Sequence, residues 1–211
     1  MGRAQLAVRI AALTVGAFSC APRARPLGGA LSPVSVPRAE LPRGYRQITF
    51  TWQYADADVQ FRGDGVARVA APDSVRLDLF LAGGLGGGRA FLIGDDLRLP
   101  DGEMLARLLP PPPLLWAALG RLSVPSASDT LVRVDGDTLR ADIGRGPTWR
   151  SAFVGGDLRR LERIADKRVH EWVARTAVGD VRYQRPVGRR SLEITVVRTE
   201  ALARLDATIW R

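Results

Sequence analysis

Two side chains of the types used in nucleophilic catalysis and metal binding occur once each in this chain, Cys20 and His170. A single cysteine cannot form an internal disulfide, and metal sites need several ligands at set spacings that are absent here. What remains for Cys20 is modification at its own sulfur, and an acyl anchor is the obvious candidate. A single histidine excludes a His-pair metal site and leaves one possible triad base. With Glu171 and Trp172 beside it, an ordinary surface or half-buried histidine is the better interpretation.

Aspartates that stand close together form a second set of candidates for chemistry. Each pair could in principle supply an acid and a base, or bind a cation. All of them fall where strands are expected to end or turn, and aspartate is a common turn residue. The sequence therefore predicts no enzyme, no metal site and no cofactor. The pairs are Asp56 with Asp58, Asp95 with Asp96, and Asp135 with Asp137.

The residues before Cys20 have the layout of a secretory signal peptide, which we expect to span residues 1–19. Arg3 and Arg9 supply positive charge, and a short apolar run follows them. This run is too short to cross a bilayer, which needs roughly 20 apolar residues.

The stretch AFSC that ends at Cys20 resembles the bacterial lipobox. In that motif the cysteine is thioether-linked to diacylglycerol and becomes the first residue of the mature protein. Ala17 and Phe18 depart from it, because the family usually has leucine and a small residue there. Ordinary signal cleavage after Ala21 is the alternative. The residue after Cys20 is not the aspartate associated with inner-membrane retention, so we expect the inner leaflet of an outer membrane.

Residues 20–44 are rich in Pro, Gly, Ala and Ser and show no period of a strand or a helix. Such a segment buries too little apolar surface to offset its ordering entropy, so we expect a flexible tether after the lipidated Cys20. Residues 45–211 are then one domain. The chain carries a formal net charge of +9, but its arginines are scattered among acids with no basic stripe, which argues against a nucleic-acid partner. A surface that suits anionic lipid headgroups is the more modest inference from this positive charge.

Most of the domain has the two-residue alternation of strands. In RQITFTWQY, the residues Ile48, Phe50, Trp52 and Tyr54 share one face, and in SVRLDLFLA the apolar positions include Leu77 and Leu79. Asp-Gly between alternating runs in LVRVDGDTLRADI indicates a hairpin. SLEITVVRT and ARLDATIWR continue the strand pattern to the end of the chain. Frequent turns favour a mainly β, antiparallel sandwich or barrel.

Residues 103–122 interrupt this pattern with two short apolar helical faces, separated by Pro110–Pro113. A run of four prolines lacks backbone donors, so no helix can pass through it. The two helices could cover the open face of a curved sheet, or they could simply pack on the core. Residues 157–175 are also ambiguous, because their apolar positions fit either a helix or strands.

The order of these parts resembles the LolA/LolB-type lipoprotein carriers and acceptors, over about residues 45–211. The resemblance rests on the leader, the strands around GDGVARVAAPDSVRLDLFLAGGLGGGRAFLIGDDLRL, the apolar helical insertion and the further strands that follow. It implies an unclosed antiparallel β-barrel of about eleven strands, with short helices as a lid over a hydrophobic cavity for acyl chains. It also implies that residues 157–175 are strands. The cavity and lid residues would be Phe50, Trp52, Leu77, Leu79, Leu105, Leu108, Leu109, Leu115, Trp116 and Leu119.

Within this resemblance the stretch AGGLGGGRA is a hairpin connection. A phosphate-binding loop is excluded, since Lys-Ser/Thr is missing and a strand-like run follows. Acceptors of the family carry an exposed apolar residue at this hairpin, often leucine before glycine, which enters the membrane; Leu85 with Gly86 matches it. A flexible turn in which Leu85 folds back on the sheet is the alternative.

The resemblance implies a monomeric outer-membrane lipoprotein on the periplasmic face, which binds acyl chains and takes part in lipoprotein or lipid localisation. Its expected partners are acyl chains, the membrane through the anchor on Cys20, and a periplasmic carrier protein. The alternative is a structural or assembly lipoprotein of the envelope that docks a protein partner through its apolar helices.

Overall fold

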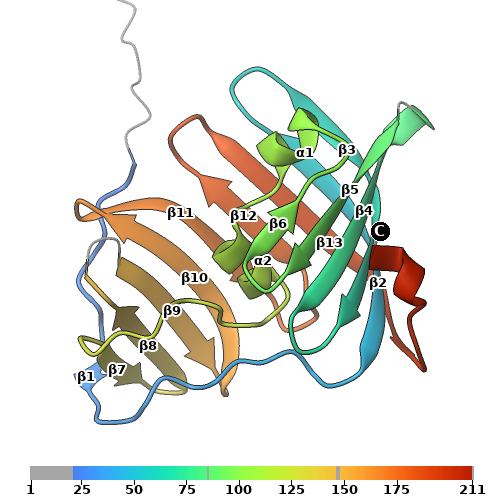
Figure 1. Cartoon of the computed structure of the whole chain (residues 1–211). Coiled ribbons are helices and arrows are strands. Elements are labelled where there is room, and N and C mark those ends of the chain that lie inside the picture. The colour runs from blue at the N-terminus through green and yellow to red at the C-terminus, as the bar shows by residue number, and fades with distance from the viewer. Residues whose placement is uncertain (1–20, 85, 146–147, 211) are drawn as a thin grey trace, which may run out of the picture.

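The computed structural model describes residues 21–84, 86–145 and 148–210, and it consists mainly of one antiparallel sheet (Figure 1). The sheet has 13 strands in the order β1-β7-β8-β9-β10-β11-β12-β13-β2-β3-β4-β5-β6. The strands are β1 (Ala30–Leu31), β2 (Tyr45–Ala55), β3 (Gln60–Ala70), β4 (Ser74–Leu81), β5 (Gly87–Ile93), β6 (Asp96–Arg98), β7 (Leu131–Asp135), β8 (Thr138–Ile143), β9 (Thr148–Val154), β10 (Asp157–Ala165), β11 (Arg168–Arg175), β12 (Val181–Arg185) and β13 (Arg190–Leu202).

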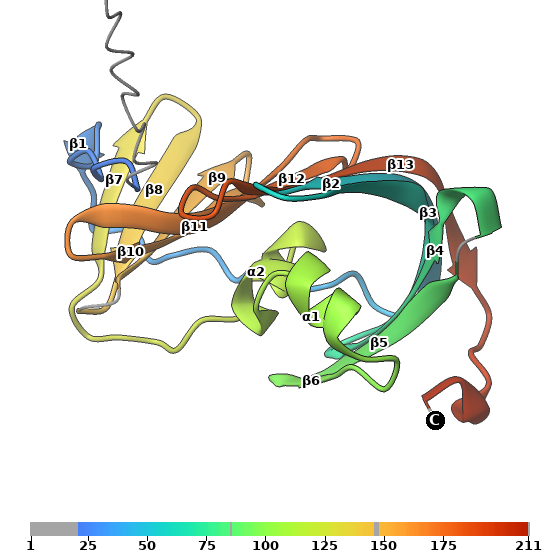
Figure 2. The same cartoon turned by 90° about the horizontal axis from the view of Figure 1, so that it is seen from above.

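The sheet curves strongly but does not close on itself. Its two edges are β1 and β6, and Figure 2 shows the sheet bending around two short helices, α1 (Glu103–Leu108) and α2 (Pro112–Ala118). The prediction of an unclosed antiparallel barrel is confirmed. The two edge strands have only 2 and 3 residues, which is too short for a recognisable alternation, and this accounts for the larger number of strands than the expected eleven.

The alternation in β2 places its apolar side chains on the concave face of the sheet. Phe50, Trp52 and Tyr54 are buried, whereas Thr51 and Gln53 between them are exposed. Successive strand residues point to opposite faces, so the concave side of the sheet becomes the wall of the core. The core cluster extends over β2 to β5, α1, α2 and β9 to β13.

Residues 157–175 form a β-hairpin rather than a helix. Strands β10 and β11 are joined by Asp166 and Lys167, whose φ angles are 51° and 58°. A two-residue connection with positive φ at both positions matches the right-handed twist of the strands on either side. The expected Asp-Gly hairpin between β7 and β8 is also present.

Residues 21–44 differ from the flexible tether that the sequence predicts. They run along the edge of the sheet: β1 pairs with β7, and the backbone N–H of Val169 donates to the carbonyl oxygen of Pro22 at 2.9 Å. Leu41 is only 6% exposed and belongs to the core. The reason is that extended Pro-rich chain can satisfy its backbone groups against a sheet edge without any apolar period of its own. The domain therefore begins well before residue 45.

The last segment also differs from expectation. Residues Ala207–Trp210 form a short 3₁₀ helix, η2, instead of a strand. The carbonyl oxygen of Ile209 accepts a hydrogen bond of 2.9 Å from Arg76 on β4, so the C-terminal segment packs on the convex side of the sheet. Asp206 caps this turn through the backbone N–H of Thr208 at 2.8 Å.

Candidate functional site: an apolar cavity under the helical insertion

A cavity of about 110 Å³ lies between the concave face of the sheet and the helical insertion, residues 103–122. Its size is of the same order as the roughly 150 Å³ apolar cavities that bind benzene in other proteins. The cavity therefore has room for a short piece of hydrocarbon. Its lining includes Ile48, Phe50, Trp52, Ala67, Leu77, Leu79, Leu109, Pro110, Leu115, Ala118, Leu119, Val173, Val181, Tyr183, Leu192, Ile194 and Val196, together with Arg46, Arg175, Val178, Gly179 and Thr199.

One strand glycine shapes the wall of this cavity. A Cβ atom on Gly65 of β3 would lie 2.3 Å from Cε2 of Phe50, its direct neighbour on β2. The absence of a side chain at Gly65 lets the Phe50 ring lie flat against β3. The ring then forms part of the cavity surface instead of standing up into the space.

The polar atoms of the aromatic wall residues are hydrogen-bonded away from the cavity. Trp52 Nε1 donates to the carbonyl oxygen of Asp64 at 2.9 Å, and the Tyr183 hydroxyl donates to Glu171 at 2.9 Å. Burial raises the pKa of Tyr183, and the charge of Glu171 raises it further, so the phenol stays neutral. Because these polar groups are already paired, the aromatic walls present hydrocarbon to a ligand.

Helix α2 forms the roof of the cavity and is held as part of the core. Residues 114–118 are all buried, and Leu115, Ala118 and Leu119 face the cavity. Trp116 has no exposed surface, and its Nε1 donates to the carbonyl oxygen of Gly94 at 2.7 Å. The guanidinium of Arg121 lies 4.6 Å from the ring centre of Trp116.

Helix α1 packs Leu105 and Leu108 in the core and is attached in addition by an ion pair at the rim of the sheet. Arg107 donates to Asp56 at 2.7 Å and lies 3.2 Å from Asp58, both on the connection between β2 and β3. Asp56 also accepts hydrogen bonds from Tyr54 and from the backbone N–H of Asp58. The Arg107 guanidinium, and then the Tyr54 hydroxyl, hold the pKa of Asp56 well below its usual range. We call Arg107, Asp56 and Asp58 the α1 latch.

The structure brings most of the predicted cavity residues together. Phe50, Trp52, Leu77, Leu79, Leu109, Leu115 and Leu119 line the cavity. Leu105, Leu108 and Trp116 do not: they are at most 1% exposed and pack in the core beside it. Cys20 and Leu85 lie outside the described residues, so the anchor and the membrane-inserting residue stay predictions. Phe80, near the end of β4, is 51% exposed.

Most of the other lining residues were not predicted, and among them Arg46 and Arg175 are the two that carry charge. Arg46 stands two residues before Ile48 and Arg175 two residues after Val173, which both line the cavity. The period of two therefore places both arginines on the concave face, and this parity is the signal that could have revealed them. Of the described residues, none pairs with either guanidinium, and Nε of Arg46 is enclosed without a partner.

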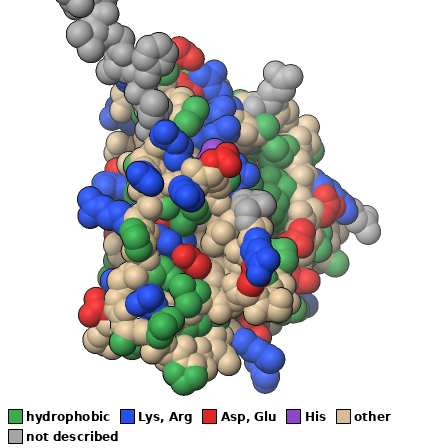
Figure 3. All heavy atoms as spheres, turned by 90° about the vertical axis from the view of Figure 1, so that its left-hand side faces the viewer, with side chains coloured by type: hydrophobic (Ala, Val, Ile, Leu, Met, Phe, Trp, Pro, Cys, Tyr) green, Lys and Arg blue, Asp and Glu red, His purple; other side chains and the backbone are tan. Residues whose placement is uncertain are grey.

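Nothing in the described part of the chain suggests metal binding, since no group of three or more His, Cys, Asp or Glu side chains gathers there. His170 on β11 is half-buried. Within the described residues, no helix has the length and apolarity to cross a membrane. Figure 3 shows Lys and Arg side chains mixed with acidic and apolar ones over one side of the molecule.

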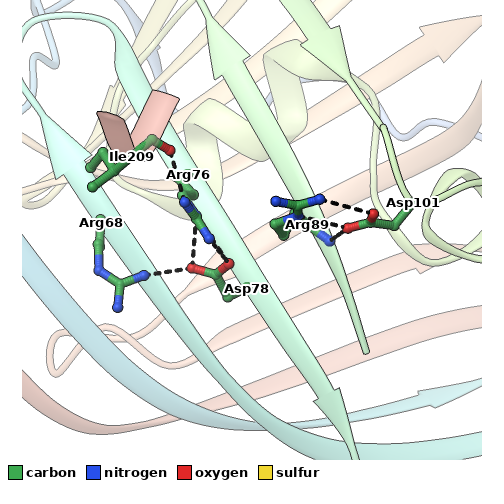
Figure 4. A network of polar contacts seen from close by, with 6 residues as sticks. All are labelled: Arg68, Arg76, Asp78, Arg89, Asp101 and Ile209. Atoms are coloured by element: carbon green, nitrogen blue, oxygen red, sulfur yellow. Dashed lines mark hydrogen bonds and ion pairs between the residues drawn. The ribbon is translucent and has the colours of Figure 1, made fainter. Parts of the chain in front are cut away.

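The convex face of the sheet carries a paired charge network (Figure 4). Asp78 of β4 is 6% exposed and accepts from Arg68 at 2.5 Å and from Arg76 at 2.7 Å. Arg89 and Asp101 form a further pair at 3.0 Å. These arginines are thus neutralised, in contrast to Arg46 and Arg175 on the concave face.

Comparison with solved structures identifies the architecture. A LolA superfamily protein from Nitrosomonas europaea superposes with a TM-score of 0.50 at 11% sequence identity, over 82% of this chain and 92% of that chain. The chain has a LolA-like fold. The other similar structures include a putative outer membrane lipoprotein-sorting protein domain from Vibrio parahaemolyticus, with a TM-score of 0.45 at 6% identity over 79% of this chain and 89% of that one. A DUF1329 family protein from Desulfovibrio piger has a TM-score of 0.45 at 10% identity over 80% and 90%. No protein-family model and no curated protein matches this chain.

Proposed function

We propose that this LolA-like chain binds acyl chains of lipids or lipoproteins in the cavity under its helical insertion, without covalent catalysis. The observation that carries the proposal is an apolar cavity whose aromatic walls have their polar atoms paired elsewhere. Burial of hydrocarbon yields about 0.8 kcal/mol for each CH₂ group. Leaving the bilayer costs a nearly equal amount, so exchange between cavity and membrane is close to isoenergetic.

The finer proposal is an outer-membrane lipoprotein, anchored through Cys20 on the periplasmic face, which takes part in lipoprotein or lipid localisation. The leader, the lipobox-like AFSC and the LolA-like fold support it. Leu85 would enter the membrane while the anchor holds the protein at the surface. A cavity of about 110 Å³ takes only part of an acyl chain, so α1 has to move aside when a whole chain enters.

Filling the cavity tests the proposal. Ala67 of β3 is 2% exposed and lines the cavity, so Ala67→Leu should fill part of it. The experiment purifies the full chain from membranes, extracts bound lipid and quantifies it by mass spectrometry. We expect lipid bound to the wild type and at least a several-fold smaller amount in Ala67→Leu.

Ala201→Leu is the matched control, because Ala201 is an exposed strand residue on β13 that does not line the cavity. It should retain wild-type lipid content. Circular dichroism establishes that each variant is folded. A folded Ala67→Leu protein with undiminished lipid, or a wild type that carries none, would refute the cavity as an acyl-chain site.

A further inference from the structure

The two arginines of the cavity stand at the same end of the sheet. Arg46 is at the beginning of β2, and Arg175 is the last residue of β11. A Cβ atom on Gly179, in the turn after β11, would lie 3.5 Å from a terminal nitrogen of Arg175 and 3.5 Å from Val196 of β13. Val178 of that turn is 75% exposed, so this end of the cavity reaches the surface. We call Arg46 and Arg175 the arginine pair.

The arginine pair is electrostatically unbalanced. Burial lowers the pKa of Arg46, and the charge of Arg175 lowers it further; burial and then the charge of Arg159 lower the pKa of Arg175. Both guanidinium groups nevertheless stay charged at neutral pH. The charge of Asp157 raises the pKa of Arg175 and offsets these effects only in part, and no described carboxylate forms an ion pair with either guanidinium. Two partly buried cations beside hydrocarbon are costly unless an anion is bound between them.

Most other arginines of the described sheet are either paired with a carboxylate or, like Arg62 and Arg168, without such a pair but exposed to solvent. On the convex face Arg68 and Arg76 share Asp78, and Arg150 pairs with Asp142 at 2.7 Å. The arginine pair combines two properties: it lines an apolar cavity, and among the described residues neither guanidinium forms an ion pair with a carboxylate. Guanidinium groups bind phosphate and carboxylate oxygens through paired N–H donors.

We propose that the ligand of this cavity is an anionic amphiphile, whose phosphate or carboxylate headgroup lies between Arg46 and Arg175 while its acyl chain lies in the cavity. This inference rests on the proposed acyl-chain binding and adds the class of headgroup to it. The aliphatic stems of the two arginines extend the apolar wall, and their charged ends face the opening, as amphipathic side chains do at the boundary between hydrocarbon and water. The hydroxyl of Thr199 at the same opening is a further donor to the headgroup.

The test compares three amphiphiles that carry different headgroups on alkyl chains of the same length. It uses the full-length protein with a neutral apolar fluorescent dye, N-phenyl-1-naphthylamine, bound in the cavity. Hexadecyl phosphate, palmitate and hexadecanol are titrated to displace the dye, each below the concentration at which it aggregates. We expect both anions to bind at least about tenfold more tightly than hexadecanol, as charge-assisted hydrogen bonds predict. Inorganic phosphate alone should not displace the dye or compete with hexadecyl phosphate at similar concentrations.

Arg46→Gln and Arg175→Gln should each reduce the affinity for the two anions toward that of hexadecanol, while hexadecanol binding stays within about twofold of wild type. Arg62→Gln is the matched control, because Arg62 is an exposed residue of β3, and its even position places it on the convex face with Arg68. It should leave every affinity unchanged. Thermal unfolding verifies each fold, and Arg46→Met replaces Arg46→Gln if that variant does not fold.

The outcomes separate the two proposals. If hexadecanol binds as tightly as the anions, or if the arginine variants keep the preference for anions, the headgroup inference is wrong while acyl-chain binding stands. Failure of all three amphiphiles to displace the dye would contradict the proposed function itself. Binding of inorganic phosphate as tight as that of hexadecyl phosphate, lost in both variants, would show a free-anion site and overturn the inference.

Discussion

The two short helices over the cavity look alike in sequence but are held by different forces. Helix α2 is embedded in the core: residues 114–118 are buried, and the indole of Trp116 bonds to Gly94 of the turn between β5 and β6. Helix α1 has buried Leu105 and Leu108, but its attachment at the rim is the latch of Arg107 with Asp56 and Asp58. Displacing α2 would remove a buried indole from the core, whereas displacing α1 would remove two buried leucines and break a partly exposed ion pair, whose charges water can solvate.

Under the proposed function, this difference points to α1 as the part of the insertion that we expect to open. The side chains of Arg107 and Asp58 are 42% and 77% exposed, whereas that of Asp56 is 4% exposed, so water reaches the latch from the side of Arg107 and Asp58. Leu109 and Pro110, which follow α1 and line the cavity, move with that helix. The expected opening motion is therefore a displacement of α1 and Leu109 about the proline run, with α2 fixed as the roof.

The largest effect expected from this comparison concerns Trp116. Trp116→Ala removes a side chain with no exposed surface and leaves a cavity, so it should lower the free energy of unfolding by about 3 to 5 kcal/mol. Urea denaturation followed by circular dichroism measures the change. Leu122→Ala, in a half-buried position at the end of the insertion, is a milder control. A loss below about 1 kcal/mol in Trp116→Ala would mean that α2 is as loosely held as α1.

An intermediate effect is expected at the latch, and on ligand exchange rather than on stability. Arg107→Gln removes the charge that joins α1 to the rim, while Asp56 keeps its bonds to Tyr54 and to the backbone of Asp58. We expect a several-fold faster dissociation of a fluorescent fatty acid in stopped-flow displacement, with only a small decrease in thermal stability. Arg98→Gln disrupts another exposed ion pair, with Asp96, and should leave the rate unchanged. An unchanged rate in Arg107→Gln would show that α1 is not the moving part.

Most strands and the two helices of the insertion were predictable because their signals are local, whereas residues 157–175 fitted either a helix or strands and became strands only through the resemblance. The alternation at Phe50 and Trp52 determines which face is buried, and the four prolines of Pro110–Pro113 divide the insertion into two helices. The latch was not predictable, because Asp56 and Arg107 are 51 positions apart and turn chemistry already accounts for the aspartate. Nothing near either residue in the sequence indicates the other.

The path of residues 21–44 was unpredictable for a related reason. This segment is held by backbone hydrogen bonds, such as that between Val169 and Pro22, and such bonds leave no trace in residue type. Arg46 and Arg175 are a different case, since the alternation that predicts Ile48 and Phe50 also places Arg46 on the concave face. The sequence therefore places Arg46 on the apolar face, but it does not show whether an acidic side chain pairs with this arginine there.

The smallest expected effect is a pH dependence of the stability that the latch contributes. The pKa of Asp56 is depressed in the folded state, chiefly by Arg107, so its contribution to stability is complete above the ordinary aspartate pKa of about 3.9 and is lost as the pH falls below that value. Arg107→Gln lets the folded-state pKa rise toward the ordinary value. The stability difference between wild type and Arg107→Gln should therefore be greatest near neutral pH and shrink from about pH 4 downward.

The control is Trp116→Phe. The indole of Trp116 does not titrate, so the stability difference between this variant and wild type should not vary with pH. Urea unfolding at several pH values between 7 and 3 measures both series. If the Arg107→Gln difference persists undiminished at pH 3, or if the Trp116→Phe difference shrinks in parallel with it, an ion pair on α1 is not what separates the two helices.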